Sequence, residues 1–307
     1  MKVANKSGKI PPPVKPGDIA AIVAPAGKIG REVVEAATET LKQWGLEVKK
    51  GRYLFGDTGY FSAPDDQRLD DLQTMLDDPE IRLILCARGG YGSARIVDRL
   101  NLRKFQSVPK WIVGFSDITA LLLHIYQQTG ICSVHGPMAK GIGSPDADIK
   151  SAELLKAQLF GVKPSYRWEN GQPEEPHTVT GRVLGGNLAI LCSLIGTASM
   201  PDMLDAILFI EDTGEPLYRI DRMLNQLKRA GILEKISGLL LGTFDPPAES
   251  SENTGNGLKE IVYNSIENPG IPVAFNFPAG HTFRNYPLII GARAKLTTGL
   301  QNTLEYL

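Results

Sequence analysis

The fold of this 307-residue chain is constrained most by an alternation of short apolar runs with helical segments in its first half. The apolar runs have the length of buried strands, and the segments after them repeat apolar residues at helical spacing. The predicted strands are residues 18–25, 46–50, 81–87 and 111–115, and the predicted helices are residues 32–44, 65–76, 93–100 and 117–128. Strands that alternate with helices in this way predict a doubly wound α/β domain, with a parallel sheet covered on both faces.

The rest of the chain predicts a second, smaller α/β domain. Between residues 144 and 180 four prolines interleave with acidic residues and no period is sustained, which predicts a linker. Residues 181–307 then return to short strands and helices. The predicted strands there are 206–211, 237–242, 273–277, 288–290 and 294–298, and the predicted helices are 185–195, 218–229 and 257–266. The proline- and lysine-rich residues 1–17 are expected to form a flexible arm, which leaves residues 18–143 as the N-terminal domain.

The composition excludes several classes of partner. Lys and Arg number 33 and Asp and Glu 34, so the net charge of −1 gives no bulk attraction to nucleic acid or to an anionic membrane. The three cysteines are widely spaced and form no C-x-x-C pair, so we expect buried thiols rather than a disulfide framework or a metal site. The sequence shows neither a signal-peptide core nor an apolar stretch of membrane-spanning length, which predicts a cytoplasmic protein.

Ser116 stands where the apolar run 111–115 stops and the helix 117–128 begins. A serine at such a junction commonly caps the helix, because its hydroxyl accepts from the free N–H groups of the first turn. The alternative is a nucleophile elbow, which projects the serine from a tight turn at the carboxyl edge of the sheet. Gly114 fits such an elbow, but Ile118 stands where the G-x-S-x-G motif has its second glycine. The local pattern leaves both interpretations open.

A serine nucleophile needs a base, and the chain has four histidines. His281 follows the predicted strand 273–277 in a glycine-preceded turn, from which it can reach a pocket at the sheet edge. A structural turn histidine is the alternative for this residue. His124 lies inside a predicted helix, His135 suits a buried or capping role, and His177 falls in the predicted linker. His281 is therefore the candidate base.

A carboxylate that orients the imidazole and stabilises its charged form completes a triad. Glu211 ends the apolar strand 206–211, where carboxylates are rare unless they are paired or functional. Asp212, Glu215 and Asp221 are nearby rivals. Because sites in open α/β sheets cluster outside the carboxyl ends of the strands, we expect the serine, the glutamate and the histidine to meet there.

A glycine-rich string, RGGYGS at residues 88–93, follows the predicted strand 81–87. Its glycines let backbone N–H groups come close to a ligand. A nucleotide-phosphate role competes, but the string is neither G-x-G-x-x-G nor a P-loop, which argues against a nucleotide cofactor. The amides of Gly90 and of Asp117, the residue after the serine, are the candidate oxyanion donors for acyl transfer.

Taken together, these residues resemble the LD-carboxypeptidases of serine peptidase family S66, a group that includes muramoyl-tetrapeptide carboxypeptidase and the microcin C immunity peptidase. The matching strings run in order from about residue 18 to residue 298, so the resemblance covers nearly the whole chain. They are IVAPA at 22–26, RGGYG at 88–92, GFSD at 114–117, HGP at 135–137, GGNL at 185–188, ED at 211–212 with Glu215, YRIDR at 218–222, and GH at 280–281 ahead of Asn285 and Pro287-Leu288.

The resemblance implies a flavodoxin-like N-terminal domain, a smaller C-terminal domain, a homodimer, and neither metal nor organic cofactor. It implies Ser116 as the nucleophile, His281 as the general base and Glu211 as its orienting carboxylate. Gly90 and Asp117 would supply the oxyanion amides. The implied reaction is hydrolysis of the L,D amide bond that releases the terminal D-alanine from a peptidoglycan-derived tetrapeptide, a step of murein recycling.

A carboxypeptidase must also hold a free carboxylate. Arg88 and Arg284 are the candidates, because a guanidinium fork matches that group. For Arg88, an ion pair with a nearby acid is the alternative. Three other functions remain: cleavage of aminoacyl-nucleotide analogues, as in the microcin branch of the family, small-ligand binding without catalysis, and metal-dependent hydrolysis, which no ligand cluster in the sequence supports.

Overall fold

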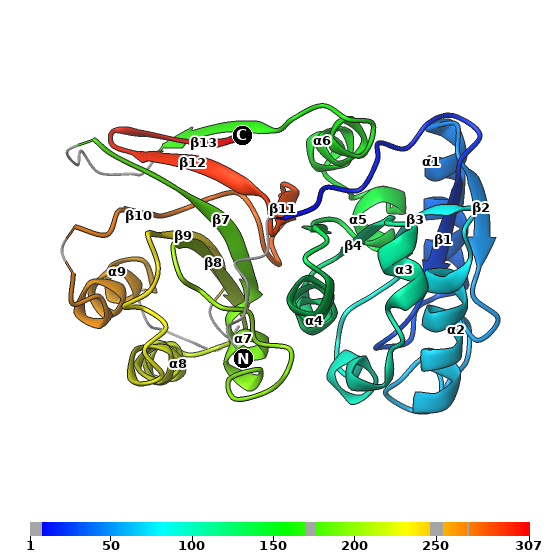
Figure 1. Ribbon diagram of the computed structural model, residues 1–307, viewed down its shortest axis with the longest axis horizontal. Coiled ribbons are helices and arrows are strands. Elements are labelled where there is room, and N and C mark those ends of the chain that lie inside the picture. Colours follow the sequence, from blue (N-terminus) through cyan, green and yellow to red (C-terminus); the bar gives the residue numbers. More distant parts are fainter. Residues whose placement is uncertain (1–7, 170–175, 246–253, 269) are drawn as a thin grey trace.

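Two β-sheets form the two halves of the protein, and helix α4 (Thr119–Thr129) lies between them (Figure 1). The computed structural model describes residues 8–169, 176–245, 254–268 and 270–307. Within these ranges, no helix is both long enough and apolar enough to traverse a bilayer. The α/β class predicted from the sequence is confirmed.

The first sheet has six strands in the order β11-β5-β4-β3-β1-β2. Strands β1 to β5 run parallel, and β11 pairs antiparallel with β5. The bounds are β1 (Ile19–Val23), β2 (Glu47–Lys50), β3 (Ile81–Cys86), β4 (Trp111–Gly114), β5 (Ser133–His135) and β11 (Leu288–Ile290). The order β2-β1-β3-β4-β5 is that of flavodoxin-like doubly wound folds, so the predicted N-terminal architecture is confirmed. Burial on both faces explains the continuous apolar runs in β1, β3 and β4.

Helices and short 3₁₀ turns cover this sheet and connect its strands. They are α1 (Arg31–Gln43), α2 (Asp65–Asp77), η1 (Ser93–Arg95), η2 (Val97–Arg99), α3 (Arg103–Ser107), η3 (Ser116–Ile118), α4, α5 (Ala139–Gly143) and α6 (Ile149–Leu159). The predicted helix over residues 93–100 is wrong, because this stretch forms the two turns η1 and η2. The backbone bonds here join residues three apart instead of four: the N–H of Ile96 donates to the carbonyl of Ser93 (3.0 Å), and the N–H of Leu100 donates to the carbonyl of Val97 (3.2 Å).

The second sheet has seven strands in the order β10-β9-β8-β7-β12-β13-β6. Strands β7 to β10 are parallel, whereas β12, β13 and β6 are antiparallel to their neighbours. The bounds of the elements are β6 (Ser165–Glu169), β7 (His177–Asn187), α7 (Leu188–Ser193), β8 (Ala206–Thr213), α8 (Leu217–Arg229), β9 (Gly238–Asp245), α9 (Thr254–Ser265), β10 (Val273–Ala274), β12 (Arg293–Thr298) and β13 (Gln301–Tyr306). The sequence predicted β8, β9, β10 and β12 and missed β6, β7 and β13, and the first three residues of the predicted helix 185–195 belong to β7.

Residues 144–180 contain more structure than the linker expected from the sequence. Helix α6 and strand β6 lie inside this range, and β7 begins at His177. Strand β6 alternates exposed and buried residues and pairs with β13, a partner that lies far away in the sequence. Strand β11 also departs from expectation, since it joins the first sheet beside β5 instead of the second sheet.

The described part of the N-terminal arm, residues 8–17, is packed against the first half of the molecule. The carbonyl of Pro12 accepts a hydrogen bond from the Trp111 indole (3.0 Å), and Val14 is buried. The prediction of a flexible arm over residues 1–17 is therefore wrong for residues 8–17, because they form hydrogen bonds and buried contacts with the first half of the molecule. The first seven residues lie outside the described residues.

The two sheets approach each other closely at the start of α4. The N–H of Asn187, at the end of β7, donates to the hydroxyl of Thr119 (3.1 Å). A Cβ at Gly186 would lie 2.4 Å from that hydroxyl oxygen, so only glycine allows this approach. The carboxyl ends of β4, β7 and β8 are thereby brought to one place in the molecule.

Candidate active site

Ser116 occupies a strained turn between β4 and α4. Its φ angle is 63°, in the left-handed region that non-glycine residues seldom adopt. Such a conformation costs on the order of 1–3 kcal/mol and is typical of functional sites. The Ser116 hydroxyl caps neither η3 nor α4 and instead bonds to His281, so the helix-cap interpretation is wrong.

The departure from the G-x-S-x-G motif also has a structural reason. A Cβ at Gly114 would lie 2.6 Å from Cγ2 of Ile118. The glycine two residues before the serine therefore makes room for the isoleucine two residues after it. Ile118 is fully buried, so the larger side chain at this position anchors the turn in the core.

Ser116, His281 and Glu211 form one hydrogen-bonded line. Nε2 of His281 lies 2.9 Å from Oγ of Ser116, and Nδ1 of His281 lies 2.8 Å from Oε2 of Glu211. Ser116 follows β4, Glu211 lies near the end of β8, and His281 lies in the turn after β10. The structure therefore brings together the three residues that the sequence predicted for a triad. When Glu211 accepts from Nδ1–H, Nε2 remains free to accept from the serine hydroxyl.

Glu211 is completely buried, with 0% exposure, and two glycines make the space for it. A Cβ at Gly242 would lie 3.0 Å from Cβ of Glu211, and a Cβ at Gly280 would lie 2.9 Å from its Oε2. Gly280 also has a φ angle of 137°, which an L side chain rarely adopts. The ring of Phe115 packs edge-on against His281, with centroids 5.0 Å apart. These contacts restrict both the carboxylate and the imidazole.

Burial and pairing shift the two ionisable groups in linked ways. Burial raises the pKa of the Glu211 carboxyl, and the hydrogen bond with His281 offsets only part of that rise. For His281, burial opposes the charged form, but the Glu211 carboxylate outweighs it and raises the pKa of the imidazole above the ordinary value of 6.5. The imidazole is thus a stronger base than a free histidine, which favours transfer of the serine proton to it.

Two of the rival carboxylates, Asp212 and Glu215, serve other contacts. Both oxygens of Asp212 are engaged, since Oδ1 accepts from Nδ2 of Asn187 (2.9 Å) and Oδ2 accepts from the N–H of Ala189 (2.9 Å). Asp212 therefore holds the start of α7. Glu215 pairs with Arg219 across 3.4 Å at the surface. Glu211 is the carboxylate that reaches the imidazole.

The other three histidines take no part in the hydrogen-bonded line of Ser116, His281 and Glu211. His135 is fully buried between the rings of Phe115 and Phe209, with centroid distances of 5.7 and 4.8 Å. Burial lowers the pKa of His135 to about 3, so this imidazole is neutral at ordinary pH. His124 is buried beside Ser199, and His177 is exposed at the start of β7.

The glycine-rich loop lies directly against the serine. A Cβ at Gly89 would lie 2.8 Å from Cβ of Ser116 and 3.3 Å from the N of Asp117, so no larger residue fits. Among the hydrogen bonds of the described residues, none uses the backbone N–H of Gly90 or of Asp117. Two free N–H groups beside a nucleophile are the arrangement that an oxyanion site requires.

The carboxylate of Asp117 has a second role that the sequence did not reveal. Its two oxygens accept from the N–H groups of Gly92 (3.2 Å) and Ser93 (2.8 Å). The residue after the nucleophile therefore fastens the glycine-rich loop to the serine turn. The sequence shows both an acid directly after the serine and a glycine-rich loop. Nothing in the sequence shows that the two are in contact.

The two arginines expected near the substrate come from different halves of the molecule. Arg88 is exposed and donates through Nη1 to the carbonyl of Lys28 (2.9 Å). Arg284 lies on the turn that carries His281 and lines a cavity of about 770 Å³. Neither arginine forms an ion pair within the described part of the chain. The cavity is also lined by Thr243, Asp245, Leu258, Lys259, Phe275, Asn276, Thr282 and Phe283.

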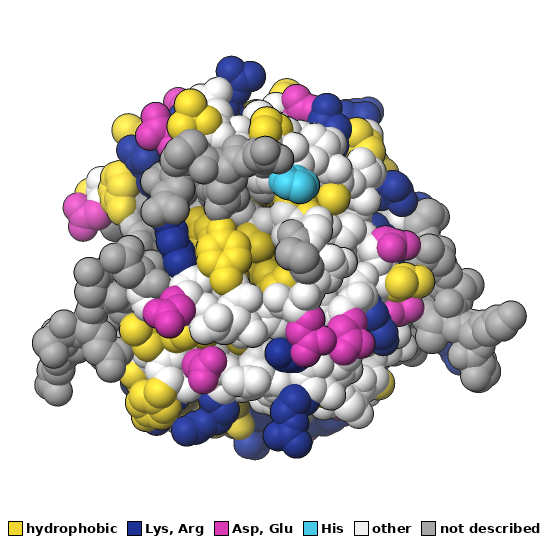
Figure 2. Space-filling view, turned by 90° about the vertical axis from the view of Figure 1, so that its left-hand side faces the viewer, with side chains coloured by type: hydrophobic (Ala, Val, Ile, Leu, Met, Phe, Trp, Pro, Cys, Tyr) yellow, Lys and Arg dark blue, Asp and Glu magenta, His cyan; other side chains and the backbone are white. Residues whose placement is uncertain are grey.

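The surface around this half is hollowed. Figure 2 shows hydrophobic side chains in a hollow on the face that carries α9 and β10, with acidic and basic side chains around it.

No group of three or more His, Cys, Asp or Glu side chains suited to a metal ion occurs among the described residues. The three cysteines are buried free thiols, as the sequence predicted.

Two domain families match the chain. The LD-carboxypeptidase N-terminal domain matches residues 20–136, and the LD-carboxypeptidase C-terminal domain matches residues 180–296. The chain belongs to the LD-carboxypeptidase family. The resemblance inferred from the sequence motifs, family S66, is thereby confirmed, and the protein is a carboxypeptidase. Ser116 falls in the N-terminal match, whereas Glu211 and His281 fall in the C-terminal one, so this LD-carboxypeptidase assembles its candidate triad from both domains.

Relatives of the LD-carboxypeptidase cover nearly its whole length. A probable murein peptide carboxypeptidase from Bacillus subtilis is 34% identical over 94% of this chain and 91% of the relative. The murein tetrapeptide carboxypeptidase of Pseudomonas aeruginosa is 30% identical over 90% of this chain and 92% of the relative. The crystal structure of muramoyltetrapeptide carboxypeptidase from Oxalobacter formigenes has a TM-score of 0.85 at 29% identity, over 94% of this chain and 98% of that one.

An MccF-like protein from Bacillus anthracis shares the fold as well. Its crystal structure has a TM-score of 0.86 at 24% identity and covers 98% of this chain and 100% of that one. At this identity the likeness supports the two-domain architecture alone.

Proposed function

We propose that this protein is a serine LD-carboxypeptidase that releases the terminal D-alanine from murein tetrapeptides, as part of murein recycling. The observation that carries the proposal is the hydrogen-bonded line of Ser116, His281 and Glu211. Relatives named murein peptide carboxypeptidase and murein tetrapeptide carboxypeptidase support the choice of substrate. The bond that breaks is the L,D amide between the third residue of the peptide stem and the terminal D-alanine.

In the proposed acylation step, Oγ of Ser116 attacks the carbonyl carbon of this amide while Nε2 of His281 takes the hydroxyl proton. Glu211 stays ionised and stabilises the imidazolium that forms. The negative charge on the former carbonyl oxygen faces the N–H groups of Gly90 and Asp117. His281 then gives its proton to the leaving nitrogen, and free D-alanine departs from a tripeptidyl ester on the serine.

In the proposed deacylation step, a water molecule takes the place of the departed alanine. Nε2 of His281 removes a proton from this water as its oxygen attacks the ester carbon. The same two N–H groups stabilise the second oxyanion. Collapse of this intermediate returns the proton to Oγ of Ser116 and releases the tripeptide with a new carboxylate.

The position of His281 determines on which side of the site each part of the substrate lies. The leaving nitrogen must approach Nε2 of His281, so the released alanine lies on the side of the turn 278–284. Arg284, on this turn, is therefore the first candidate for holding the terminal carboxylate. Arg88 is the second candidate, because one of its nitrogens already donates to a backbone carbonyl. We also propose a homodimer, which light scattering of the purified protein would test, and a cytoplasmic location, which fractionation of the cells would test.

The experiment is incubation of the purified protein and of its Ser116→Ala variant with a murein tetrapeptide, followed by mass spectrometry. Loss of one alanine with the wild type alone is the expected result. Loss of alanine with both proteins would remove Ser116 from the mechanism. No loss with either protein would exclude the tetrapeptide as substrate, and aminoacyl-nucleotide analogues would then be tested with the same two proteins.

A further inference from the structure

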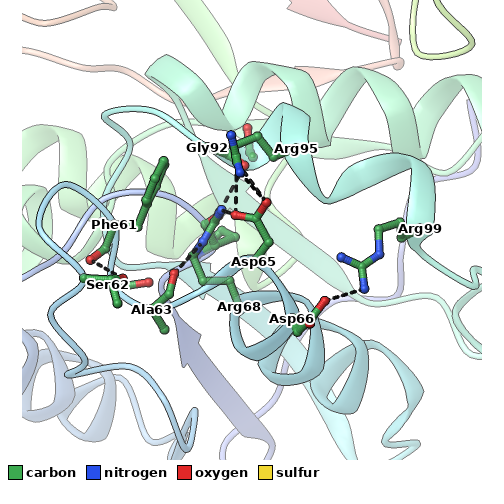
Figure 3. Close-up of polar contacts among 12 residues, drawn as sticks. Phe61, Ser62, Ala63, Asp65, Asp66, Arg68, Gly92, Arg95 and Arg99 are labelled. Carbon is green, nitrogen blue, oxygen red and sulfur yellow. Dashed lines mark hydrogen bonds and ion pairs between the residues drawn. The ribbon is translucent and has the colours of Figure 1, made fainter.

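The guanidinium of Arg68, near the start of α2, is buried against the glycine-rich loop. Its side chain has no exposed surface, and a buried charge is costly unless hydrogen bonds and an opposite charge compensate for it. Nε donates to the carbonyl of Ala63 (3.0 Å), and Nη2 donates to Asp65. Nη1 donates to the carbonyls of Pro25 and Gly92 (3.0 Å for Gly92). Figure 3 shows the guanidinium at this meeting point, where it joins the segments that follow β1, β2 and β3.

The peptide group between Gly89 and Gly90 carries one of the two N–H groups proposed for the oxyanion. Its carbonyl oxygen, on Gly89, accepts from the N–H of Gly27 (3.0 Å). The C=O and the N–H of one planar trans peptide group point in opposite directions, so the bond to the C=O also fixes the direction of the Gly90 N–H. A Cβ on Gly27 would lie 2.8 Å from the Gly89 oxygen, so only glycine lets the two segments approach this closely. The segment after β1 therefore orients this N–H.

Arg68 holds the segment after β1 and the glycine-rich loop at a fixed distance from each other. Its Nη1 bonds Pro25 in the first segment and Gly92 in the second. The N–H of Gly92 donates to the carboxylate of Asp117 (3.2 Å), so both polar groups of this residue's backbone are held. A Cβ on Gly92 would lie 2.9 Å from Nη1, and its φ angle is 129°, so the contact requires glycine. The loop is thus fastened to the serine turn on one side and to the guanidinium on the other.

We propose that Arg68 is a positioning residue of the oxyanion site. Through the carbonyls of Pro25 and Gly92, it keeps the Gly90 N–H aimed at the place where negative charge develops in the transition state. The guanidinium acts through the backbone and does not touch the substrate. This inference rests on the proposed function, because the N–H has this task only if an oxyanion forms beside Ser116.

The fork of the guanidinium is the property that the site uses. A guanidinium is planar and directs several N–H groups at fixed angles, whereas a lysine carries its charge on a single nitrogen. Arg68→Lys therefore keeps the charge and loses the simultaneous grip on both segments. Removal of one oxyanion donor lowers kcat by about 10²- to 10³-fold, so a donor that is displaced but present should cost less.

A second buried cation of α2 provides the matched control. Lys110 is 1% exposed, and its Nζ donates to the carbonyls of Met75 (3.0 Å) and Asp78 at the carboxyl end of the helix. Arg68 lies near the other end, and the 13 residues of α2 span about 20 Å. Lys110→Met also leaves buried carbonyls without their cationic donor, so it should destabilise the protein without reaching the oxyanion site.

The first readout is kcat and KM for alanine release from a murein tetrapeptide by each folded variant. In Arg68→Lys, kcat should fall by about 10- to 100-fold while KM stays within about twofold, because the oxyanion contact forms only in the transition state. Lys110→Met should keep the wild-type kcat even though its free energy of unfolding in urea is lower. A purely structural role of Arg68 would leave kcat of the folded protein unchanged, as in the control.

The second readout is hydrogen exchange of the loop, measured by mass spectrometry without substrate. The N–H groups of Gly92 and Ser93 are bonded to Asp117 and should be protected in the wild type. In Arg68→Lys they should exchange at least about tenfold faster than in Lys110→Met, because the loop has lost its second attachment.

An unchanged kcat in Arg68→Lys, a fall in kcat that Lys110→Met shares, or a rise in KM alone would overturn the proposal. If Arg68→Lys does not fold, Asp65→Asn takes its place, since it weakens only the bond to Nη2. Its kcat should then fall at least about threefold at constant KM, and Asp66→Asn, at an exposed pair with Arg99, should not change it. An unchanged kcat in Asp65→Asn would overturn the proposal as well.

The two readouts separate failure of this inference from failure of the proposed function. If the wild type releases no alanine, the proposed function fails and hydrogen exchange decides. Faster exchange of the loop in Arg68→Lys than in Lys110→Met would still support Arg68 as the residue that positions the Gly90 N–H. Equal exchange in the two variants would overturn it.

Discussion

Replacing Glu211 by glutamine removes the charge of the candidate triad while keeping its shape. The side chain is fully buried and fills the space that Gly242 and Gly280 leave for it, and an isosteric amide occupies the same volume. What is lost is the charge-assisted hydrogen bond of 2.8 Å to the imidazole. Such a bond contributes about 1.5–3 kcal/mol, which corresponds to about 10- to 150-fold in rate when it stabilises the imidazolium of the transition state.

A second effect of Glu211→Gln adds to the first. If the amide NH₂ faces Nδ1 of His281, the ring proton moves to Nε2, which then cannot accept the proton of Ser116. The corresponding acid-to-amide change in a serine protease triad lowers kcat by about 10⁴-fold through this tautomer effect. We therefore expect kcat of the variant to fall by about 10² to 10⁴-fold, between the electrostatic value and the full tautomer value.

The assay is alanine release from a murein tetrapeptide, measured across pH. Catalysis needs neutral His281, and Glu211 raises the pKa of its imidazole above 6.5, so wild-type activity should fall as the pH drops through a value above 6.5. In Glu211→Gln this acid limb should move to lower pH, because the carboxylate that raised the pKa is gone. Glu215→Gln, at a surface pair with Arg219, is the matched control and should keep both the wild-type kcat and the wild-type pH at which activity falls. A loss of less than about threefold, or an unmoved limb, would refute the reasoning.

Three further substitutions probe the nucleophile turn and the loop against it. Gly89→Ala places a methyl group 2.8 Å from Cβ of Ser116, so kcat should fall at least about 100-fold. Circular dichroism should show that the variant is folded, and wild-type turnover by the folded variant would contradict this prediction. Asp117→Asn leaves one N–H of the glycine-rich loop without its carboxylate acceptor, so kcat should fall by about 10- to 100-fold with little change in KM. An unchanged kcat in steady-state kinetics would show that this carboxylate does not position the loop. Ser116→Gly relieves the φ angle of 63° and should raise the free energy of unfolding in urea by about 1 kcal/mol, whereas a less stable variant would show that the turn is not strained.

The meeting of the three triad candidates was predictable because of a general property of parallel sheets. Ser116 and Glu211 each follow or end an apolar run, and His281 follows another, so their strand ends were expected to lie together. The apolar runs themselves revealed β1, β3 and β4, since a strand buried on both faces is apolar throughout.

The features that escaped the sequence depend on contacts between distant segments. Strand β6 is short and half exposed, and its partner β13 lies more than 130 residues later, so no local pattern marks either of them strongly. Residues 93–100 have helical spacing, but their backbone bonds run to the third residue back, as in Ile96 N–H to Ser93, and Ser93 is tied to Asp117, which lies 24 residues away in the sequence. The positions of Arg88 and Arg284 were equally hidden, because exposed side chains leave no periodic signal.

The account's central claim is that Ser116 is the nucleophile of a carboxypeptidase. The most direct test mixes the wild type with a murein tetrapeptide, stops the reaction with acid during turnover and maps the acyl group by mass spectrometry. The account predicts a tripeptidyl group, the substrate less its D-alanine, on the peptide that carries Ser116, and none in the Ser116→Ala variant. Acylation of another residue, or alanine release at an undiminished rate by Ser116→Ala, would contradict it.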